Sequence, residues 1–382
     1  MRLLHTADWH VGKQIRGRSR ADEHRAVLAE IARLTRERDV DVVLVAGDLF
    51  ETAAPAPESE QIVYQALLDL ASTGATVAVT AGNHDNPRRL AAVAPLLELG
   101  RVLLVAEPTG PDDGGVAALT VGDERLNIAM LPFVSQRGIV RVEQLMRDDP
   151  DQHAQAYAER LNRVVESLVA PIADDADAVN VMMTHLTVAG GTLGGGERSV
   201  HTLGAYAISA AAFPSSLHYV ALGHLHRAQQ MPAPCPTWYS GSPLQLDFGE
   251  ENDAKQVLLI DAEPSAPVRV EPVRIESGRR LATVTGSLSD LRELDTDPES
   301  WLRVRLREKA KSGIADEVRR LLPNAVDVTL VRDDEPDERP RVERIGREPQ
   351  ELFAEYLAQH DVDDRALLDL FSDLHEEAMD AP

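Results

Sequence analysis

The sequence predicts an α/β fold built around a parallel β-sheet, on the strength of three observations. Residues 42–46 form an apolar run rich in valine, which is typical of a strand buried on both faces. Helical spacing at 58–72 and a second apolar run at 75–80 follow, and this alternation implies right-handed crossovers between parallel strands. The third observation is that five apolar runs each stop at a residue type that binds metal ions. Open parallel sheets place their ligands at the carboxyl ends of strands, so these ends are the candidate site.

The first strand is expected over residues 3–6, and Asp8 and His10 follow it. Because these two residues are two positions apart, an extended backbone points both side chains the same way. Residues 13–20 form a basic loop, which is either exposed to solvent or a patch that contacts phosphate groups. Its four cations are Lys13, Arg16, Arg18 and Arg20. Residues 21–37 then show helical spacing, with apolar side chains on one face.

The other predicted strands end in the same manner, at metal-ligand residues. The run 42–46 leads to Asp48, 75–80 to Asn83 and His84, 179–184 to His185, and 217–222 to His224 and His226. Between these runs, short strands are expected at 101–133 and a helix of about 20 residues before position 170. The glycine-rich loop 189–204 lacks the Gly-Lys-Ser/Thr ending of a P-loop, and we expect it to be a mobile loop at the site.

The sequence pattern of the C-terminal third of the chain predicts smaller structural units. Strands at 238–243 and 256–261 are expected to close a sheet, and the shift to Pro, Glu and Val at 262–278 marks a domain boundary. Residues 280–333 alternate between strands and helices, as a small α+β unit does. A charged, proline-rich linker at 332–349 then leads into two amphipathic helices. The predicted domains are 1–262, 263–340 and 341–382.

Composition excludes several classes of protein. A chain of 382 residues can hold two or three domains, and it has no apolar run of about 18 residues such as a transmembrane helix needs. Cys235 is the single cysteine, which excludes a disulfide framework and cysteine-based metal sites. No signal peptide is evident, so a cytoplasmic location is expected. The net charge of -24 argues against a protein that coats nucleic acid by itself, although it permits a local basic groove.

Together the strand ends offer carboxylate, imidazole and amide groups, a set that is typical of a two-metal site. Two divalent cations about 3.5–4 Å apart can clamp the attacking and leaving oxygens of a displacement at phosphorus. Cations that close need a bridging carboxylate, and Asp48 on the central strand is the natural bridge. The mixed ligands suit Mn²⁺, Fe²⁺ or Zn²⁺ better than Ca²⁺ or Mg²⁺. Because metal ions can activate water, no serine or cysteine nucleophile is needed.

These motifs resemble the calcineurin-like metallophosphoesterase superfamily and, within it, the SbcD family of bacterial nuclease subunits. The resemblance covers essentially the whole chain and rests on Asp8-Trp9-His10-Val11-Gly12, Gly47-Asp48-Leu49-Phe50, Ala81-Gly82-Asn83-His84-Asp85, Ala221-Leu222-Gly223-His224-Leu225-His226, Tyr239-Ser240-Gly241-Ser242-Pro243 and Phe248-Gly249-Glu250. It implies a four-layer α/β metallophosphoesterase sandwich (1–262), a small α+β capping domain (263–340) and C-terminal partner-binding helices (341–382).

Carried over position by position, the resemblance implies a role for each site residue. One metal ion would be held by Asp8, His10, Asp48 and His226. A second would be held by Asp48, Asn83, His185 and His224. His84 would be the acid that protonates the leaving alkoxide or stabilises the transition state. Asp85 would either orient His84 or cap the following helix.

The resemblance further implies a metal-dependent DNA nuclease subunit, an exonuclease on duplex ends and an endonuclease on single strands or hairpins. Such subunits act with SbcC, an ATPase with a long coiled coil, in DNA end processing, replication and recombination. This chain has no Walker A sequence, so ATP use must come from that partner. The expected cofactors are two divalent ions, Mn²⁺ first among the candidates, and the expected assembly is a homodimer within a heterotetramer.

The resemblance also implies which segments bind the partner and which residues bind DNA. The helices of 341–382 resemble the segment that binds SbcC, and the alternative is that they pack on their own domain. Much of the charge that attracts DNA would come from SbcC. Within this chain, further positive charge for DNA binding is expected from Lys13, Arg16, Arg18, Arg88 and Arg89.

Two other functions compete with this interpretation. A small-substrate metallophosphodiesterase, such as a cyclic-nucleotide hydrolase, would have the same metal site but less need of a cap and partner helices. A non-catalytic scaffold would keep the fold and lose ligands, and in this sequence no ligand is missing.

Overall fold

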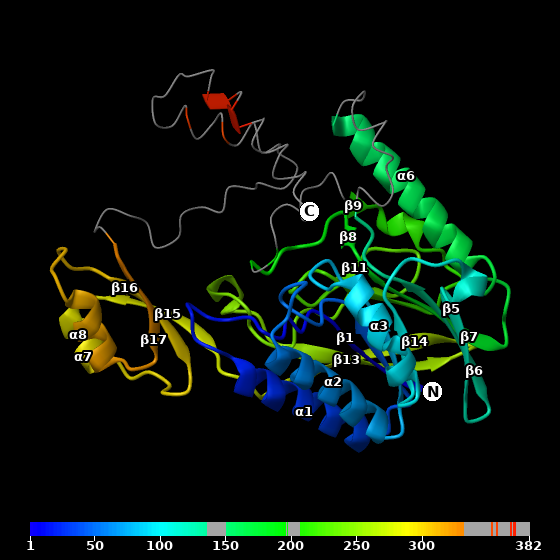
Figure 1. The fold of residues 1–382 in the computed structure, drawn as a ribbon, viewed down its shortest axis with the longest axis horizontal. Coiled ribbons are helices and arrows are strands. Elements are labelled where there is room, and N and C mark those ends of the chain that lie inside the picture. Colours follow the sequence, from blue (N-terminus) through cyan, green and yellow to red (C-terminus); the bar gives the residue numbers. More distant parts are fainter. Residues whose placement is uncertain are drawn as a thin grey trace.

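The structure of the chain, a computed structural model, has two six-stranded β-sheets packed face to face at its centre (Figure 1). It describes residues 1–135, 150–195, 197, 207–331, 353, 357, 367, 368, 370 and 371. The first sheet has the order β14 (Ala266–Arg274), β13 (Gln256–Glu263), β1 (Arg2–Thr6), β2 (Val42–Ala46), β3 (Thr76–Thr80) and β4 (Val102–Val105). The second has the order β11 (Gln229–Met231), β12 (Thr237–Tyr239), β10 (Tyr219–Gly223), β7 (Ala178–His185), β6 (Glu124–Leu131) and β5 (Val116–Val121). Strands β1 to β4 are parallel, as predicted.

Burial on both faces explains why β2 is apolar throughout. Val42 and Leu44 face the second sheet, in a core that also contains Val181 of β7. Val43 and Val45 point the other way and pack against the helices. Because successive side chains of a strand alternate between faces, a strand covered on both sides reads as one continuous apolar run.

Helices cover the outer face of each sheet, which makes the fold a four-layer α/β sandwich as predicted. They are α1 (Ala21–Glu37), α2 (Pro57–Ser72) and α3 (Pro87–Glu98) on the first sheet and α6 (Pro150–Val169) on the second. Tyr157 and Leu161 anchor α6 in its core. The side chain of Asn86 accepts a hydrogen bond from the Arg89 N–H at 3.2 Å and so caps α3. The connections contain β8 (Thr187–Val188), β9 (Ala207–Ile208) and the 3₁₀ turns Pro111–Asp113, Ala210–Ala212 and Phe248–Glu250.

A small α+β unit, called the cap here (residues 281–330), follows the two sheets. Its elements are β15 (Leu281–Gly286), α7 (Leu288–Glu293), β16 (Trp301–Leu306), α8 (Ile314–Leu321) and β17 (Ala325–Leu330). The strands are parallel, and Leu302, Val304 and Val318 belong to a separate core. Ser287 begins α7 with a reciprocal capping box. The predicted order of strand, helix, strand, helix and strand is confirmed.

The first sheet extends further along the chain than composition suggests. Strand β14 pairs antiparallel with β13, from Gln256 opposite Arg274 to Glu263 opposite Ala266. The division predicted at 262/263 therefore cuts through a hairpin of this sheet. The reason is that β14 is an edge strand with an exposed face, so it carries the Pro, Glu and Arg residues that resemble a linker.

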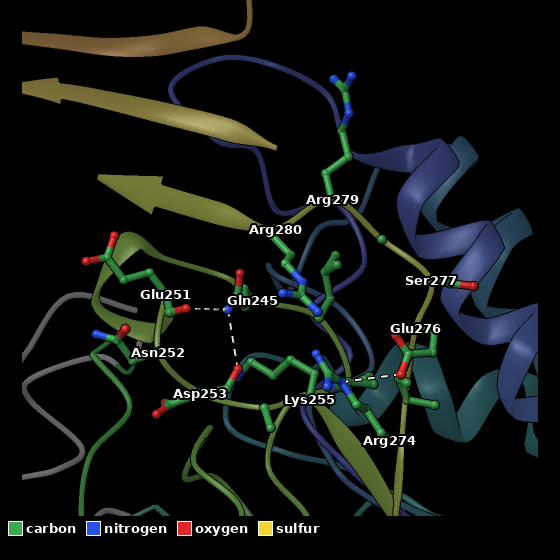
Figure 2. A pocket seen from close by; sticks show the side chains of 15 residues that line it. Gln245, Glu251, Asn252, Asp253, Lys255, Arg274, Glu276, Ser277, Arg279 and Arg280 are labelled. Atoms are coloured by element: carbon green, nitrogen blue, oxygen red, sulfur yellow. Dashed lines mark hydrogen bonds and ion pairs between the residues drawn. The ribbon is translucent and has the colours of Figure 1, made fainter. Parts of the chain in front are cut away.

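The cap is joined to α1 and to the loop at Gln245 by hydrogen bonds that lie next to a buried ion pair. Arg20, whose side chain is 0% exposed, lies 2.7 Å from Glu23. Glu23 also accepts a hydrogen bond from Trp301 Nε1 at 2.9 Å, and Gln245 Oε1 accepts one from the Leu281 N–H at 2.7 Å. A polar cavity of about 200 Å³, lined in part by Gln245, lies beside this junction (Figure 2). Arg20 is thus a structural residue and not part of a solvated basic loop.

The predicted linker at 332–349 and the two C-terminal helices predicted over 341–382 lie largely outside the described residues. The six that are described there are helical. The rings of Phe353 and Phe371 stack with their centroids 4.3 Å apart, and Leu357 is buried. Within the described part of the chain, no helix is long and apolar enough to span a membrane.

Candidate metal centre

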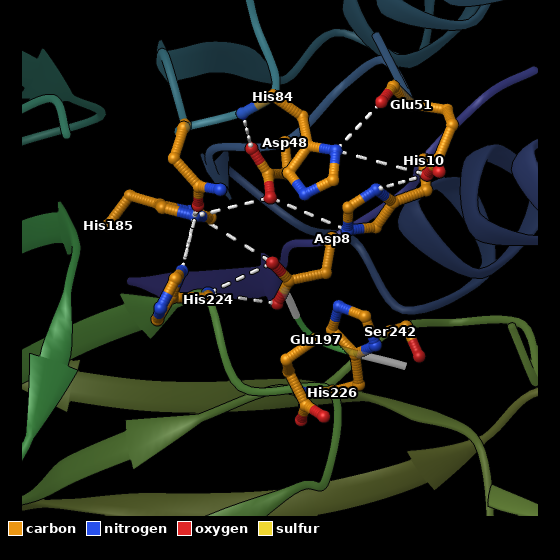
Figure 3. Close-up of polar contacts among 12 residues, drawn as sticks. Asp8, His10, Asp48, Glu51, His84, His185, Glu197, His224, His226 and Ser242 are labelled. Atoms are coloured by element: carbon orange, nitrogen blue, oxygen red, sulfur yellow. Dashed lines mark hydrogen bonds and ion pairs between the residues drawn. The ribbon is translucent and has the colours of Figure 1, made fainter. Parts of the chain in front are cut away.

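The carboxyl ends of β1, β2, β3, β7 and β10 meet between the two sheets (Figure 3). The structure brings together all eight residues that the sequence predicts for the site: Asp8, His10, Asp48, Asn83, His84, His185, His224 and His226. In the described residues, three groups have ligand atoms within 4.8 Å of one another. They are Asp8 with His10 and His226, His10 with Asp48 and His84, and Asp8 with Asp48 and His185.

The backbone turns sharply at the ends of β1 and β2. Asp8, His10 and Asp48 have φ angles of 54°, 47° and 53°, in the left-handed region that residues other than glycine seldom adopt. The turns let the Asp8 N–H donate to Gly47 O and the His10 N–H donate to Asp48 O, both at 3.0 Å. Backbone of this kind is concentrated at functional sites, and here it aims neighbouring side chains at one point.

Two glycines provide the space in which the strand ends approach. A Cβ added to Gly82 would overlap the Asp48 side chain. A Cβ added to Gly223 would overlap the Ala46 carbonyl oxygen and lie 2.8 Å from His185 Nδ1. The glycine before Asn83 is therefore required by close contact between neighbouring strand ends of the first sheet, and the glycine before His224 by close contact between the two sheets.

Asp48 lies at the middle of the cluster. Its Oδ2 atom is 3.4 Å from His10 Nε2 and 3.4 Å from His185 Nε2, which come from different sheets. Its Oδ1 atom accepts the His84 N–H at 2.8 Å. This is the central position that a bridging carboxylate would need.

The donor set fits metal ions. His10 Nε2 is buried and has no hydrogen-bond partner among the described residues, while its Nδ1 contacts Glu51 Oε2 at 3.0 Å. His185 Nδ1 donates to Ala46 O at 2.8 Å, so its Nε2 atom faces the cluster. Asn83 Oδ1 lies 3.0 Å from that Nε2, which places another acceptor beside it. Acceptor atoms that converge in this way can hold a cation between them.

The pKa values show that the surroundings favour positive charge at this point. Burial alone would lower the pKa of His185, but Asp48 and Asp8 raise it to about 9. Although burial raises the pKa of Asp48, His185 and His10 lower it well below its ordinary value. Burial raises the pKa of Asp8 to about 6. A proton on His185 offsets the negative charge in the metal-free chain, and a bound cation would do the same.

His84 lies beside the cluster and is buried. Its Nδ1–H donates to the Glu51 carbonyl oxygen at 2.7 Å, which holds the ring in place. Its ring meets that of His10 edge-on, with centroids 4.5 Å apart. Since ligand atoms of His84 and Asp48 also lie within 4.8 Å, the position is close enough to act on a group held by the metal ions.

Asp85 does not cap the following helix; its carboxylate holds two loops together instead. Its carboxylate accepts hydrogen bonds from the N–H groups of Gly82 at 2.8 Å, Phe50 at 3.0 Å and Leu49 at 3.2 Å. Burial, followed by the charge of Asp48, raises its pKa to about 7. Asp85 thus ties the loop after β2 to the loop after β3, and Asn86 is the residue that caps α3.

Three carboxylates that sequence reasoning did not assign also border the site. Glu51 and Glu250 contact the Nδ1 atoms of His10 and His226, each at 3.0 Å, and Glu197 Oε1 accepts the His226 N–H at 3.0 Å. Glu197 confirms that the described part of the loop 189–204 lies at the site; Arg198 and Ser199 lie outside the described residues. Glu51, three positions after Asp48, could have been noticed from the sequence.

Several of the predicted DNA-binding cations already have acidic partners. Lys13 lies 2.9 Å from Glu51, Arg16 2.7 Å from Asp327 and Arg89 2.6 Å from Glu60. The Arg16 contact joins the loop after β1 to the cap. These pairs offset part of the positive charge, although partly exposed pairs of this kind add little to stability.

Comparisons with known proteins agree with this geometry. The sequence model of the calcineurin-like phosphoesterase family matches residues 1–228. The SbcD subunit of nuclease SbcCD from Bacillus subtilis is 31% identical, over 98% of this chain and 97% of that protein. The SbcD subunit of nuclease SbcCD from Rhodobacter capsulatus is 36% identical, over 72% of this chain and 69% of that protein. The protein of the same name from Escherichia coli K12 is 28% identical, over 80% of this chain and 78% of that protein.

Proposed function

This chain belongs to the calcineurin-like phosphoesterase family and, within it, to the SbcD family of nuclease subunits. From that premise we propose that its strand ends hold two divalent metal ions for the hydrolysis of DNA phosphodiester bonds. The chain is a metal-dependent nuclease subunit that acts with SbcC. The observation that carries the proposal is the position of Asp48, with imidazole nitrogens of both sheets 3.4 Å from one carboxylate oxygen.

The ligands divide into two sets that share Asp48. One ion is held by Asp8, His10, Asp48 and His226, and the other by Asp48, Asn83, His185 and His224. The contacts of Asn83 with His185 and His224, at 3.0 and 2.8 Å, support the second set. When bound, the ions supply Lewis-acid stabilisation of the phosphate oxygens and activate water. Imidazole, amide and carboxylate ligands together suit Mn²⁺.

His84 is the proposed acid. Its Nδ1–H is held by the Glu51 carbonyl and its backbone N–H by Asp48, so the ring has one orientation. We assign to its Nε2 atom the role of giving a proton to the leaving alkoxide. The proposal thus needs no side-chain nucleophile.

DNA is favoured over a small phosphodiester as substrate. The relatives that cover most of the chain are named nucleases, and the cap is present and fastened to the loop after β1 by Arg16 and Asp327. We propose exonuclease activity on duplex ends and endonuclease activity on single strands and hairpins. A scaffold without chemistry would lack ligands, and all eight site residues lie together.

The C-terminal segment is the proposed contact with SbcC. In its described part, Leu367 and Leu370 are 38% and 51% exposed, which leaves apolar side chains available to a partner. The double substitution Leu367→Glu/Leu370→Glu should abolish co-purification with SbcC and leave Mn²⁺ binding intact. Unchanged co-purification would show that this segment is not the contact with SbcC.

A homodimer is proposed through α2 and α3. Leu68 on α2, Leu96 on α3 and Leu99 just after it are 42%, 69% and 85% exposed. Such side chains are expected to be covered by a second copy, giving a dimer that two SbcC chains complete as a heterotetramer. Sedimentation should show a dimer for the natural chain and a monomer for Leu96→Glu/Leu99→Glu. A natural chain that sediments as a monomer at micromolar concentration would refute this.

The function is tested by cleavage of end-labelled duplex and hairpin DNA in Mn²⁺, by the natural chain and His84→Ala, with and without SbcC and ATP. We expect cleavage by the natural chain, none after chelation, and a large loss in His84→Ala with Mn²⁺ still bound. DNA left intact together with hydrolysis of a cyclic nucleotide would replace the proposal by the small-substrate enzyme. Binding to SbcC without any hydrolysis would indicate a scaffold.

A further inference from the structure

The two histidines assigned to the first metal ion, His10 and His226, each contact a carboxylate that is not itself assigned as a ligand. His10 Nδ1 lies 3.0 Å from Glu51 Oε2, and His226 Nδ1 lies 3.0 Å from Glu250 Oε1. In contrast, His185 of the second set donates to a neutral backbone carbonyl, Ala46 O. Both carboxylates are distant in sequence from the histidines they contact: Glu250 is 24 residues from His226, and Glu51 is 41 residues from His10.

Glu250 is completely buried and is itself held by several groups. Its Oε2 atom lies 2.7 Å from Lys255 Nζ and accepts the Leu246 N–H at 3.0 Å. Lys255, 9% exposed, also donates to Ser242 Oγ at 2.8 Å and to the His226 carbonyl oxygen at 3.2 Å. One lysine therefore contacts both the carboxylate and the backbone of the histidine that the carboxylate holds.

The backbone of His226 is fixed on both sides as well. Its N–H donates to Glu197 Oε1 at 3.0 Å, and its carbonyl oxygen accepts the Ser242 N–H at 3.1 Å. With the backbone fixed, only the rotation and the tautomer of the ring are still free, and the contact between Nδ1 and Glu250 fixes both. A ring that donates its Nδ1–H to a carboxylate keeps its lone pair on Nε2.

We propose that Glu250, supported by Lys255, is the positioning residue that fixes the ring and the Nδ1–H tautomer of His226 for metal binding. The inference rests on the proposed role of His226 as a ligand. A carboxylate that accepts the second N–H of a ligating histidine orients the ring and raises its basicity. Lys255 stabilises that carboxylate, which is buried.

Two observations favour this role over simple core packing. A buried ion pair usually adds little to the stability of a fold compared with apolar residues of the same size, so packing alone does not explain Glu250 and Lys255. The same arrangement also recurs at the other imidazole of the set, where Glu51 contacts His10 at 3.0 Å and Lys13 at 2.9 Å. Two loops that are distant in sequence thus present a lysine, a glutamate and a ligating histidine in the same order of contact.

The experiment measures Mn²⁺ binding by calorimetry in the full-length, metal-free chain and in three variants. Glu250→Gln removes the charge but leaves an acceptor for Nδ1–H. Glu250→Gln/Lys255→Met also removes the lysine that the amide would leave unpaired, so a folded variant is available if the single one unfolds. Glu251→Gln is the matched control, since its Oε2 atom has no hydrogen-bond partner among the described residues. Thermal unfolding of each metal-free variant is recorded in parallel.

We expect the Kd of one of the two Mn²⁺ ions to rise about 10–100-fold in both Glu250 variants, with no change for Glu251→Gln. The melting temperature of the metal-free double variant should remain near that of the natural chain, and DNA cleavage should recover at high Mn²⁺. Unchanged Mn²⁺ affinity in the Glu250 variants would overturn the inference, whether or not stability falls.

The natural chain in the same titration tests the proposed function separately. Two bound ions support the ligand assignment, and the variants then decide the role of Glu250. If the natural chain bound no ion, the ligand assignment would fail and this inference with it.

Discussion

A single methyl group at position 223 should disturb both the stability and the metal affinity of this chain. In Gly223→Ala the added carbon would overlap the Ala46 carbonyl oxygen and lie 2.8 Å from His185 Nδ1. Strands β10 and β2 belong to different sheets, so the sheets must move apart at the metal centre to accept it. That movement would break the hydrogen bond from His185 Nδ1 to Ala46 O, which is 2.8 Å long.

Two costs follow from this contact. Overpacking a dense core costs about 1–3 kcal/mol, and a buried carbonyl that loses its donor costs about 1–3 kcal/mol more. Restricting the unfolded chain returns about 0.4–1 kcal/mol when glycine becomes alanine. We therefore expect the free energy of unfolding to fall by about 1–5.5 kcal/mol. Because His185 is a proposed ligand, its displacement should also weaken Mn²⁺ binding.

The assay is urea unfolding of the metal-free chain, followed by Mn²⁺ calorimetry. Gly110→Ala is the matched control, because Gly110 has an ordinary φ of -65° and the nearest described atom, Asp113 Oδ2, is 3.4 Å from an added Cβ. The control should lose neither stability nor affinity. Equal unfolding free energies for the two variants would refute the close contact between the sheets.

Three further predictions follow from other parts of the structure. Mn²⁺ at 100 times its Kd should stabilise the chain by about 2.7 kcal/mol per ion, seen as a higher melting temperature that chelation reverses; no shift would refute specific binding. His5, buried with its Nδ1 2.9 Å from the Tyr219 hydroxyl, has its pKa lowered by burial from 6.5 to about 3. The stability that neutral His5 contributes to the folded chain is therefore complete above pH 6.5 and is lost as pH falls toward 3. In metal-free unfolding experiments, His5→Gln should flatten the dependence of the unfolding free energy on pH over that range. Glu23→Gln leaves the buried guanidinium of Arg20 without its charge partner, so it should cost about 3–5 kcal/mol in thermal unfolding and loosen the cap to limited proteolysis; an unchanged melting temperature would contradict this.

Local sequence was sufficient to locate the strand ends and the residues that follow them. A strand buried on both faces is apolar at every position, so β2 stands out from its surroundings without knowledge of its neighbours. The site residues are within a few positions of such runs. Since parallel strands present their carboxyl ends at one edge, their meeting could be predicted from the order of elements alone.

Edge strands and single polar residues were harder to predict. Strand β14 alternates between exposed and half-buried positions, and its composition resembles that of a linker. Asp85 follows a ligand motif, which suggested two local roles. Its actual donors include Phe50 and Leu49, 35 and 36 residues earlier, and no local pattern records them.

The sequence by itself determined the α/β class, the order of the elements and the ligand types, because each depends on residues that are close together in the chain. Tertiary structure alone decided which polar residues support the ligands. Glu250 reaches His226 across 24 residues, and Arg20 reaches Gln245 across 225. Such contacts depend on how the two sheets and the cap pack against one another, and a charged residue destined for burial has the same local sequence signature as one that remains in water.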